Sequence, residues 1–249
     1  MSNFRIRFGR RLADVLEAPT ARYHAFDATP ATRLRATLRP GDVLLVEGDS
    51  RVATAIKYLT TSTWSHAAFF VGGPPETELI EADLRSGVHR VGLDAHEHLN
   101  TRICRPVGLD GMSRERVVEH MVAAIGQTYD LKNIVDLARY LLPQPPIPRR
   151  FRRRMLALGS GDPTRAICST LIAEAFQTVR YPILPEPVDG DAREAIYRIR
   201  HHSLFVPRDF DLSPFFRIVK PTIETGFDFR AMNWAEGETE TGSLPAPPD

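Results

Sequence analysis

Short apolar runs separated by turn residues fill the first half of the chain. Arg39-Pro40-Gly41-Asp42 is typical of a turn, and the apolar run over 43–47 that follows it predicts a strand. Further strands are expected over 64–71, 78–82, 87–91 and 101–107. Because the links between these runs are short, we expect the sheet to be antiparallel.

Helical periodicity takes over in the second half. Ser113 is expected to cap a helix that Gly126 ends. Its apolar stripe consists of Val117, Val118, Met121, Val122 and Ile125. A second helix is expected over 132–142 and a third over 165–179, the third with Leu171, Ile172, Ala175, Phe176 and Val179 facing the core.

A short helix is also expected directly after the first strand. Asp49 or Ser50 can cap it, and Val52, Ile56 and Leu59 share one of its faces. Strands that come first and helices that come later predict an α+β domain, with an antiparallel sheet packed against helices.

Composition divides the chain into three regions. We expect a basic arm over 1–37, a folded domain over 38–221 that contains an insert at 143–161, and a largely disordered extension over 222–249. In the arm, residues 4–18 mix arginines with apolar residues, which is typical of a basic amphipathic helix. Such a helix either packs on its own domain or contacts a membrane surface.

The overall composition excludes several classes of function. The 249 residues are 43% hydrophobic and carry a net charge of +1, so a sizeable core is possible and no nucleic-acid partner is expected. Only two cysteines are present, Cys104 and Cys168, and no apolar signal core follows the first residues. The longest apolar run, over 67–71, is too short to span a bilayer. We therefore expect a cytoplasmic protein, with peripheral membrane contact as the variant.

Cys168 lies in the first turn of the third predicted helix. Unpaired backbone N–H groups and the positive end of the helix dipole favour a thiolate at that position. This placement suits a nucleophile, although a buried cysteine at a helix start can equally be a small apolar filler.

His66 and Glu81 are polar residues in otherwise apolar strands. An imidazole next to Ala67, Ala68 and Phe69 is costly to bury unless a partner satisfies its nitrogens. If the two strands pair, Glu81 can hold one ring nitrogen while the other faces the thiol of Cys168, which is the arrangement of orienter, base and nucleophile. The alternatives are a satisfied core histidine and a surface glutamate on an edge strand.

These residues, in this order, resemble a known family. Arg39-Pro40-Gly41-Asp42, Trp64-Ser65-His66, Leu79-Ile80-Glu81-Ala82, Gly126-Gln127-Thr128-Tyr129-Asp130 and Ile167-Cys168-Ser169 are similar to motifs of the permuted papain-like amidases. These are NlpC-type cysteine hydrolases of the YiiX and YaeF-like group, distantly similar to lecithin retinol acyltransferase. The resemblance implies a circularly permuted papain-like fold, because the histidine here precedes the cysteine.

The resemblance also implies the chemistry. Cys168 would be the nucleophile, His66 the general base and Glu81 the orienter, while Tyr129 would lie near the thiol, either assisting the oxyanion or serving as a core tyrosine. An acyl-enzyme would form on the thiol, and no cofactor or metal is implied. The histidines show no zinc-site spacing, and His96, His98, His201 and His202 are expected in loops.

The preferred interpretation is an amidase or peptidase acting on a peptide or a small amide. One alternative is a lipid-directed thiol acyltransferase or esterase, docked on anionic membrane through the basic arm and the arginines from Arg149 to Arg154, a run that is also typical of a solvated helix face. Another is a binding module that retains the fold without catalysis. The substrate is therefore expected to be a peptide, a lipid or another small molecule.

Overall fold

A six-stranded antiparallel sheet forms the centre of the computed structural model, which describes residues 18, 25, 28–83, 86–128, 167–189, 196–224, 226–228 and 230. The strand order is β4-β3-β2-β1-β5-β8. The strands are β1 (Val43–Val46), β2 (His66–Phe70), β3 (Leu79–Asp83), β4 (Gly87–Val91), β5 (Thr101–Pro106) and β8 (Phe216–Val219). The α+β class and the antiparallel sheet expected from the sequence are therefore confirmed, and β1 to β5 match the predicted runs within a few residues.

Two-residue periodicity in the strands divides the core between the two faces of the sheet. Val43 and Leu45 point to one face, and Leu44 and Val46 point to the other. All four side chains are buried, because both faces are covered by other elements.

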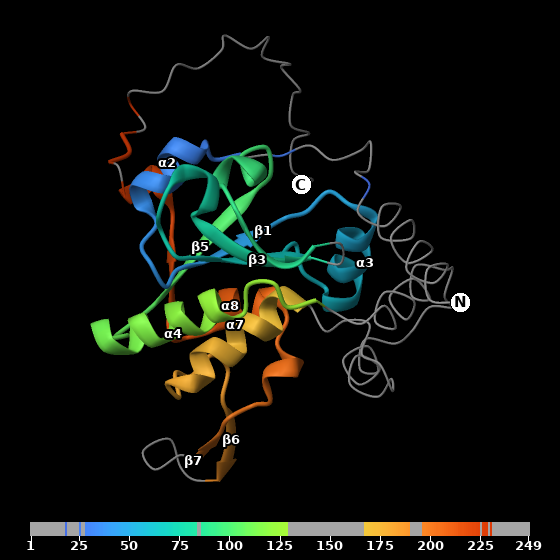
Figure 1. Cartoon of the computed structure of the whole chain (residues 1–249), viewed down its shortest axis with the longest axis vertical. Helices are drawn as coiled ribbons and strands as arrows, with labels where there is room; N and C mark the ends of the chain where they lie inside the picture. Colours follow the sequence, from blue (N-terminus) through green and yellow to red (C-terminus); the bar gives the residue numbers. More distant parts are fainter. Residues whose placement is uncertain are drawn as a thin grey trace, which may run out of the picture.

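Helices cover both faces of the sheet (Figure 1). One face packs against α4 (Gly111–Ala123), α7 (Ile167–Thr178) and α8 (Pro207–Leu212). On the other face lie α2 (Ala31–Thr37), the 3-10 helix η2 (Leu93–His96) and α9 (Pro221–Glu224), with α2 contacting both of the others. Helix α2 falls within the predicted basic arm, yet its Leu34 is fully buried in the second core.

The remaining elements connect the sheet. Helix α3 (Arg51–Thr60) joins β1 to β2, and the 3-10 helices η1 (Pro75–Thr77) and η3 (His202–Leu204) precede β3 and α8. A separate hairpin of β6 (Glu186–Asp189) and β7 (Ile196–Arg198) was not expected from the sequence, nor was the edge strand β8.

Helix caps and faces differ in part from the expectation. Asp110, not Ser113, caps α4, because its side chain accepts the backbone N–H of Ser113. Of the predicted stripe, Val117 and Met121 are buried, whereas Val122 and Ile125 are exposed at its end. Ser50 caps α3 as one of the two candidates.

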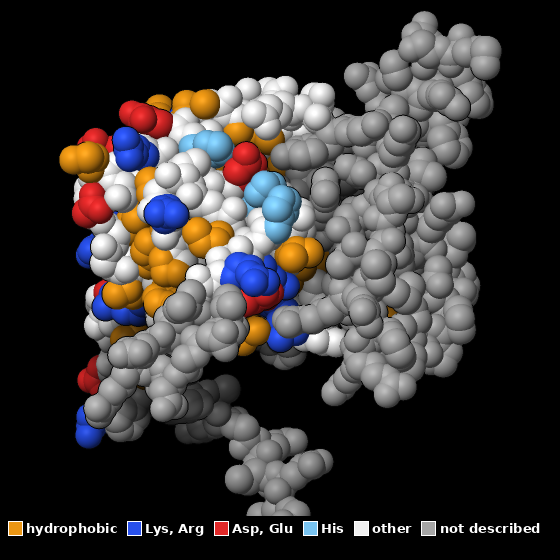
Figure 2. All heavy atoms as spheres, turned by 90° about the horizontal axis from the view of Figure 1, so that it is seen from below, with side chains coloured by type: hydrophobic (Ala, Val, Ile, Leu, Met, Phe, Trp, Pro, Cys, Tyr) orange, Lys and Arg blue, Asp and Glu red, His pale blue; other side chains and the backbone are white. Residues whose placement is uncertain are grey.

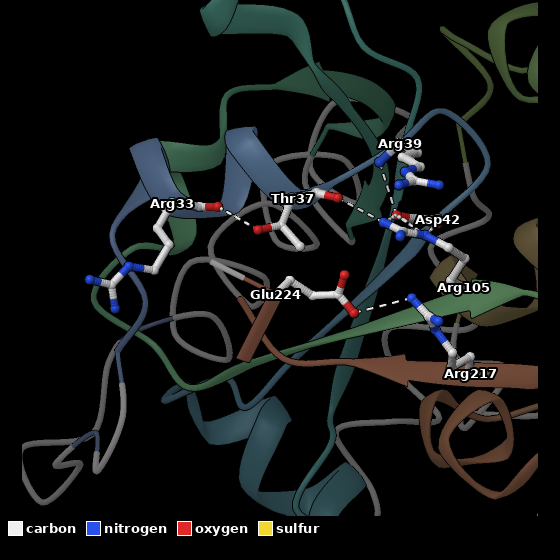
Figure 3. Close-up of polar contacts among 7 residues, drawn as sticks. All are labelled: Arg33, Thr37, Arg39, Asp42, Arg105, Arg217 and Glu224. Atoms are coloured by element: carbon white, nitrogen blue, oxygen red, sulfur yellow. Dashed lines mark hydrogen bonds and ion pairs between the residues drawn. The ribbon is translucent and has the colours of Figure 1, made fainter. Parts of the chain in front are cut away.

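A buried ion pair fixes the turn before β1 (Figure 3). Asp42, whose side chain is 2% exposed, accepts hydrogen bonds from Arg105 of β5: Nη2 donates to Oδ2 at 2.6 Å, and Nε is shared between Oδ1 at 2.9 Å and Oδ2 at 3.1 Å. The same carboxylate accepts the backbone N–H of Arg39 at 2.9 Å, and Arg105 also donates to the Thr37 carbonyl at 2.7 Å. One carboxylate and one guanidinium thus join the end of α2, the turn and β5.

The β6–β7 side of the molecule exposes apolar side chains. Tyr197 and Ile199 are more than half exposed there. Figure 2 views this side and shows hydrophobic side chains interspersed with Lys and Arg. Among the described residues, no helix is long and apolar enough to cross a membrane.

Several predicted segments lie outside the described residues. These are the helix over 132–142, the insert 143–161 with the arginines from Arg149 to Arg154, the extension beyond residue 230 and, apart from residue 18, the helix over 4–18.

Candidate active site

The strands β2 and β3 pair over a short distance and then diverge. Their register consists of Phe69 opposite Ile80 and Phe70 opposite Leu79. At its other end β2 pairs with β1 alone, where His66 lies opposite Val46. The side of β2 that faces β3 is therefore open near His66.

The start of α7 occupies this opening. Cys168, 5% exposed, forms a side-chain hydrogen bond with His66 and accepts backbone hydrogen bonds from Ala67 and Ser169. The helix is fixed there by Ser169, whose hydroxyl donates to the Phe205 carbonyl at 3.0 Å. Further along, Phe176 packs edge-on against Phe69 of β2, with ring centroids 6.1 Å apart. These contacts place the sulfur between the two diverging strands.

Glu81 holds the imidazole from the opposite side. The Nε2 of His66 lies 2.8 Å from Oε2 of Glu81, and because a carboxylate only accepts, this nitrogen donates its proton. With Nε2 engaged, Nδ1 is the nitrogen left for Cys168. The structure thus brings Cys168, His66 and Glu81, which are distant in sequence, into one hydrogen-bonded chain.

Electrostatics favour a charged Cys168–His66 pair. Burial opposes ionisation of the thiol, but the positive charge and hydrogen bond of His66, together with the two backbone N–H groups, outweigh it and lower the pKa of Cys168. Burial likewise opposes protonation of His66, but the charges of Cys168 and Glu81 raise its pKa well above the usual value. Both shifts favour a thiolate beside an imidazolium over the neutral pair.

Glu81 remains ionised for related reasons. Burial would raise the pKa of its carboxyl, whereas the charge and hydrogen bond of His66 and the hydrogen bond from His96 lower it well below the usual range. Its side chain is 10% exposed.

Two more histidines surround Glu81, and sequence reasoning missed both. His96 is buried in η2 rather than lying in a loop as expected, and its Nε2 donates to Oε2 of Glu81 at 2.9 Å. His202 belongs to η3, so its expected loop placement is wrong as well. His89 of β4 lies opposite Glu81 in the sheet, with its Nε2 3.5 Å from Oε1. The alternating pattern of β4 could have revealed His89, because a tight β3–β4 hairpin puts the two residues side by side.

The other cysteine has the opposite environment. Cys104 lies in β5 with no exposed surface, and burial, reinforced by the negative charge of Asp211, raises the pKa of its thiol far above the usual value. A thiol in this state is unreactive.

Tyr129 lies outside the described residues. The segment just before it runs along β4, because Gly126 donates to the Val88 carbonyl and Val88 donates to the Gln127 carbonyl, both at 2.9 Å. Gly87 makes this approach possible, since a Cβ there would lie 2.2 Å from the Gln127 oxygen.

A polar cleft of about 660 Å³ opens beside Trp64, two residues before His66. Trp64 donates to Asp211 at 3.1 Å, and the Arg102 guanidinium lies over the Trp64 ring. Neither His66 nor Cys168 lines this cleft, so it is separate from the hydrogen-bonded chain.

No protein-family model matches the sequence, and no curated protein matches it either.

Proposed function

We propose that this protein is a cysteine hydrolase that cleaves an amide bond in a peptide or a small amide. The observation that carries the proposal is the hydrogen-bonded chain from Cys168 through His66 to Glu81. A nucleophile, a base bonded to it and a carboxylate that orients the base form the general arrangement of covalent acyl transfer.

The proposed reaction uses each of these groups in turn. The Cys168 thiolate attacks the carbonyl carbon, and the electron pair of the C=O bond moves to the oxygen. The backbone N–H of Cys168, in the first turn of α7, is suited to stabilise that oxyanion. The His66 imidazolium then gives its proton to the departing nitrogen, which leaves an acyl-enzyme and a neutral imidazole. The imidazole next takes a proton from water, and the resulting attack releases the acid and the thiol.

The order of the residues supports a circularly permuted papain-like architecture as part of the proposal. The strand with His66 and the strand with Glu81 precede the helix with Cys168 along the chain. The same spatial site is expected whichever of these elements comes first, because the sheet and helix fix the side chains, not the connections between them.

The lipid-directed alternative uses the same thiol chemistry. It differs by its need for membrane docking, and the arginines from Arg149 to Arg154 that would provide this lie outside the described residues. The Glu81 orienter matches the hydrolase pattern, so the amide substrate is preferred. Co-sedimentation with anionic vesicles at low salt would be expected only under the lipid-directed alternative.

Labelling with iodoacetamide across pH tests the proposal. We expect selective alkylation of Cys168, with a midpoint below the ~8.5 of a free thiol. The Cys168→Ala variant should lose the label and Cys104→Ala should keep it. In His66→Ala the midpoint should move to higher pH, because the imidazolium that stabilises the thiolate is gone.

Turnover of a chromogenic amide and of the matching ester then shows which type of bond the protein cleaves. Turnover of the amide that disappears in Cys168→Ala supports the hydrolase. Equal labelling of both cysteines, or a Cys168 thiol that does not react at any pH below 9, would instead identify a non-catalytic binding module.

A further inference from the structure

One oxygen of the Glu81 carboxylate is in hydrogen-bond contact with two imidazole rings. One ring would be enough to orient a single base. Oε2 of Glu81 lies 2.8 Å from Nε2 of His66 and 2.9 Å from Nε2 of His96. These three donor atoms all lie within 4.8 Å of one another. His89 approaches the other oxygen, Oε1, and so leaves Oε2 to the first two rings.

This donor set has the chemistry of a zinc site. Two imidazole nitrogens and one carboxylate oxygen bind Zn²⁺ at about 2.0–2.2 Å, which places tetrahedral ligand atoms roughly 3.3 Å apart. The observed separations from Oε2 are a few tenths of an ångström shorter, and the two ring nitrogens lie within 4.8 Å of each other, so the rings would move outward to admit the ion. Imidazole ligands favour zinc and its transition-metal neighbours over Mg²⁺ or Ca²⁺.

We propose that Nε2 of His66, Nε2 of His96 and Oε2 of Glu81 bind one Zn²⁺ ion, and that this ion inhibits the Cys168 thiol chemistry. The fourth position of the metal is filled by water. Cys168 is not a ligand, because it contacts His66 from the side of the ring opposite Nε2.

Inhibition follows from the tautomer that zinc requires. Zinc takes the lone pair of Nε2, so the ring proton of a neutral His66 must reside on Nδ1. An Nδ1 that already carries a proton cannot accept one from the thiol or from water. If it gave that proton to a departing amine, an imidazolate would remain. Zinc therefore blocks both proton transfers while leaving the sulfur in place.

The metal site stands on the three ligand atoms alone, whereas its inhibitory effect rests on the proposed function. The two parts can be measured separately. His98 provides a matched control for His96, because it is exposed and lies two residues away in the same short segment.

Zinc affinity is measured on the full-length chain, stripped of metal, by competition with a chromophoric chelator. We expect one tight Zn²⁺ per chain and at least tenfold weaker binding in His96→Gln. This variant retains an N–H donor for Glu81 but loses the zinc ligand, so the local structure should be preserved. His98→Ala and Cys168→Ala should keep the wild-type affinity. Unchanged affinity in His96→Gln, or loss of affinity in Cys168→Ala, would overturn the site.

The inhibitory effect is read from alkylation and turnover with and without equimolar Zn²⁺, with Mg²⁺ as the control ion. Zinc should lower wild-type turnover at least tenfold, and His96→Gln should largely escape this effect relative to its own zinc-free rate. Equal inhibition of both would show that zinc acts directly on the thiol, against the proposal. A Cys168 that is unreactive even without metal would refute the proposed hydrolase, while the chelator competition would still decide the zinc site.

Discussion

Two buried carboxylates lie towards opposite ends of the central strands, and their partners differ in kind. The Asp42 carboxylate accepts from the guanidinium of Arg105 and from the backbone N–H of Arg39 in its own turn. Glu81 meets the imidazoles of His66, His96 and His89. Both side chains are at most 10% exposed.

The difference separates a structural carboxylate from one with a chemical role. A guanidinium is always charged, so the Asp42 pair holds three elements together in one state. An imidazole exchanges protons, so the carboxylate beside it controls which protonation state of the neighbour is favoured. Burial makes both arrangements strong, but only the partner decides whether the result is rigidity or reactivity.

Removal of the structural carboxylate should give the largest loss of stability. Asp42→Ala leaves the guanidinium of Arg105, 12% exposed, without its counter-ion, and should lower the free energy of unfolding by about 3–5 kcal/mol. Urea denaturation measures this. Glu224→Ala, which breaks the exposed pair with Arg217 shown in Figure 3, is the control and should cost less than about 1 kcal/mol. Equal losses of unfolding free energy in the two variants would show that the Asp42 carboxylate has no special structural role.

Replacement of the second carboxylate should affect chemistry more than stability. In Glu81→Gln a charge that raises the pKa of His66 is removed, so that pKa should fall and the imidazolium should be lost at a lower pH than in the wild type. Amide turnover should drop roughly 10²-fold. Histidine ring NMR across pH follows the titration midpoint of His66 directly. If the titration midpoint of His66 is the same in Glu81→Gln as in the wild type, Glu81 does not act on His66 as proposed.

The two cysteines show the same contrast between a structural and a reactive group, and the variant of Cys104 should have the smallest effect. Cys104→Ala removes one buried sulfur from an apolar setting and should cost about 1 kcal/mol of unfolding free energy. Its alkylation profile and turnover should match those of the wild type, since Cys104 lies in β5, which β1 separates from the strand that carries His66. A shift in the Cys168 labelling midpoint in this variant would contradict the separation of the two thiols.

The sequence predicted strands better than it predicted contacts. Short apolar runs bounded by turn residues located β1 to β5, because much of each strand is buried. This pattern missed β8, a four-residue edge strand whose Arg217 is exposed and which is recognised only by its pairing with β5. The predicted N-cap of α4 was wrong. Asp110 and Ser113 are both residue types that cap helices well, and only the backbone conformation decides which of them does so.

The candidate site was partly accessible from sequence. Polar residues in apolar strands pointed to His66 and Glu81, because burial of such groups requires a partner. His96 gave no such signal, since it lies in a short 3-10 helix without a periodic pattern. Its contact with Glu81 depends on how η2 folds back against the sheet, which is a long-range property.

The short pairing between β2 and β3 determines which insertions and deletions the chain can tolerate during evolution. The sulfur of Cys168 accepts a hydrogen bond from the backbone N–H of Ala67, the residue next to His66. The distance between the sulfur and the imidazole is therefore set where β2 and β3 diverge. The links between the elements do not set that spacing. Their lengths can therefore change, provided that β3 still carries Glu81 beside His66 and the first turn of α7 still reaches Ala67.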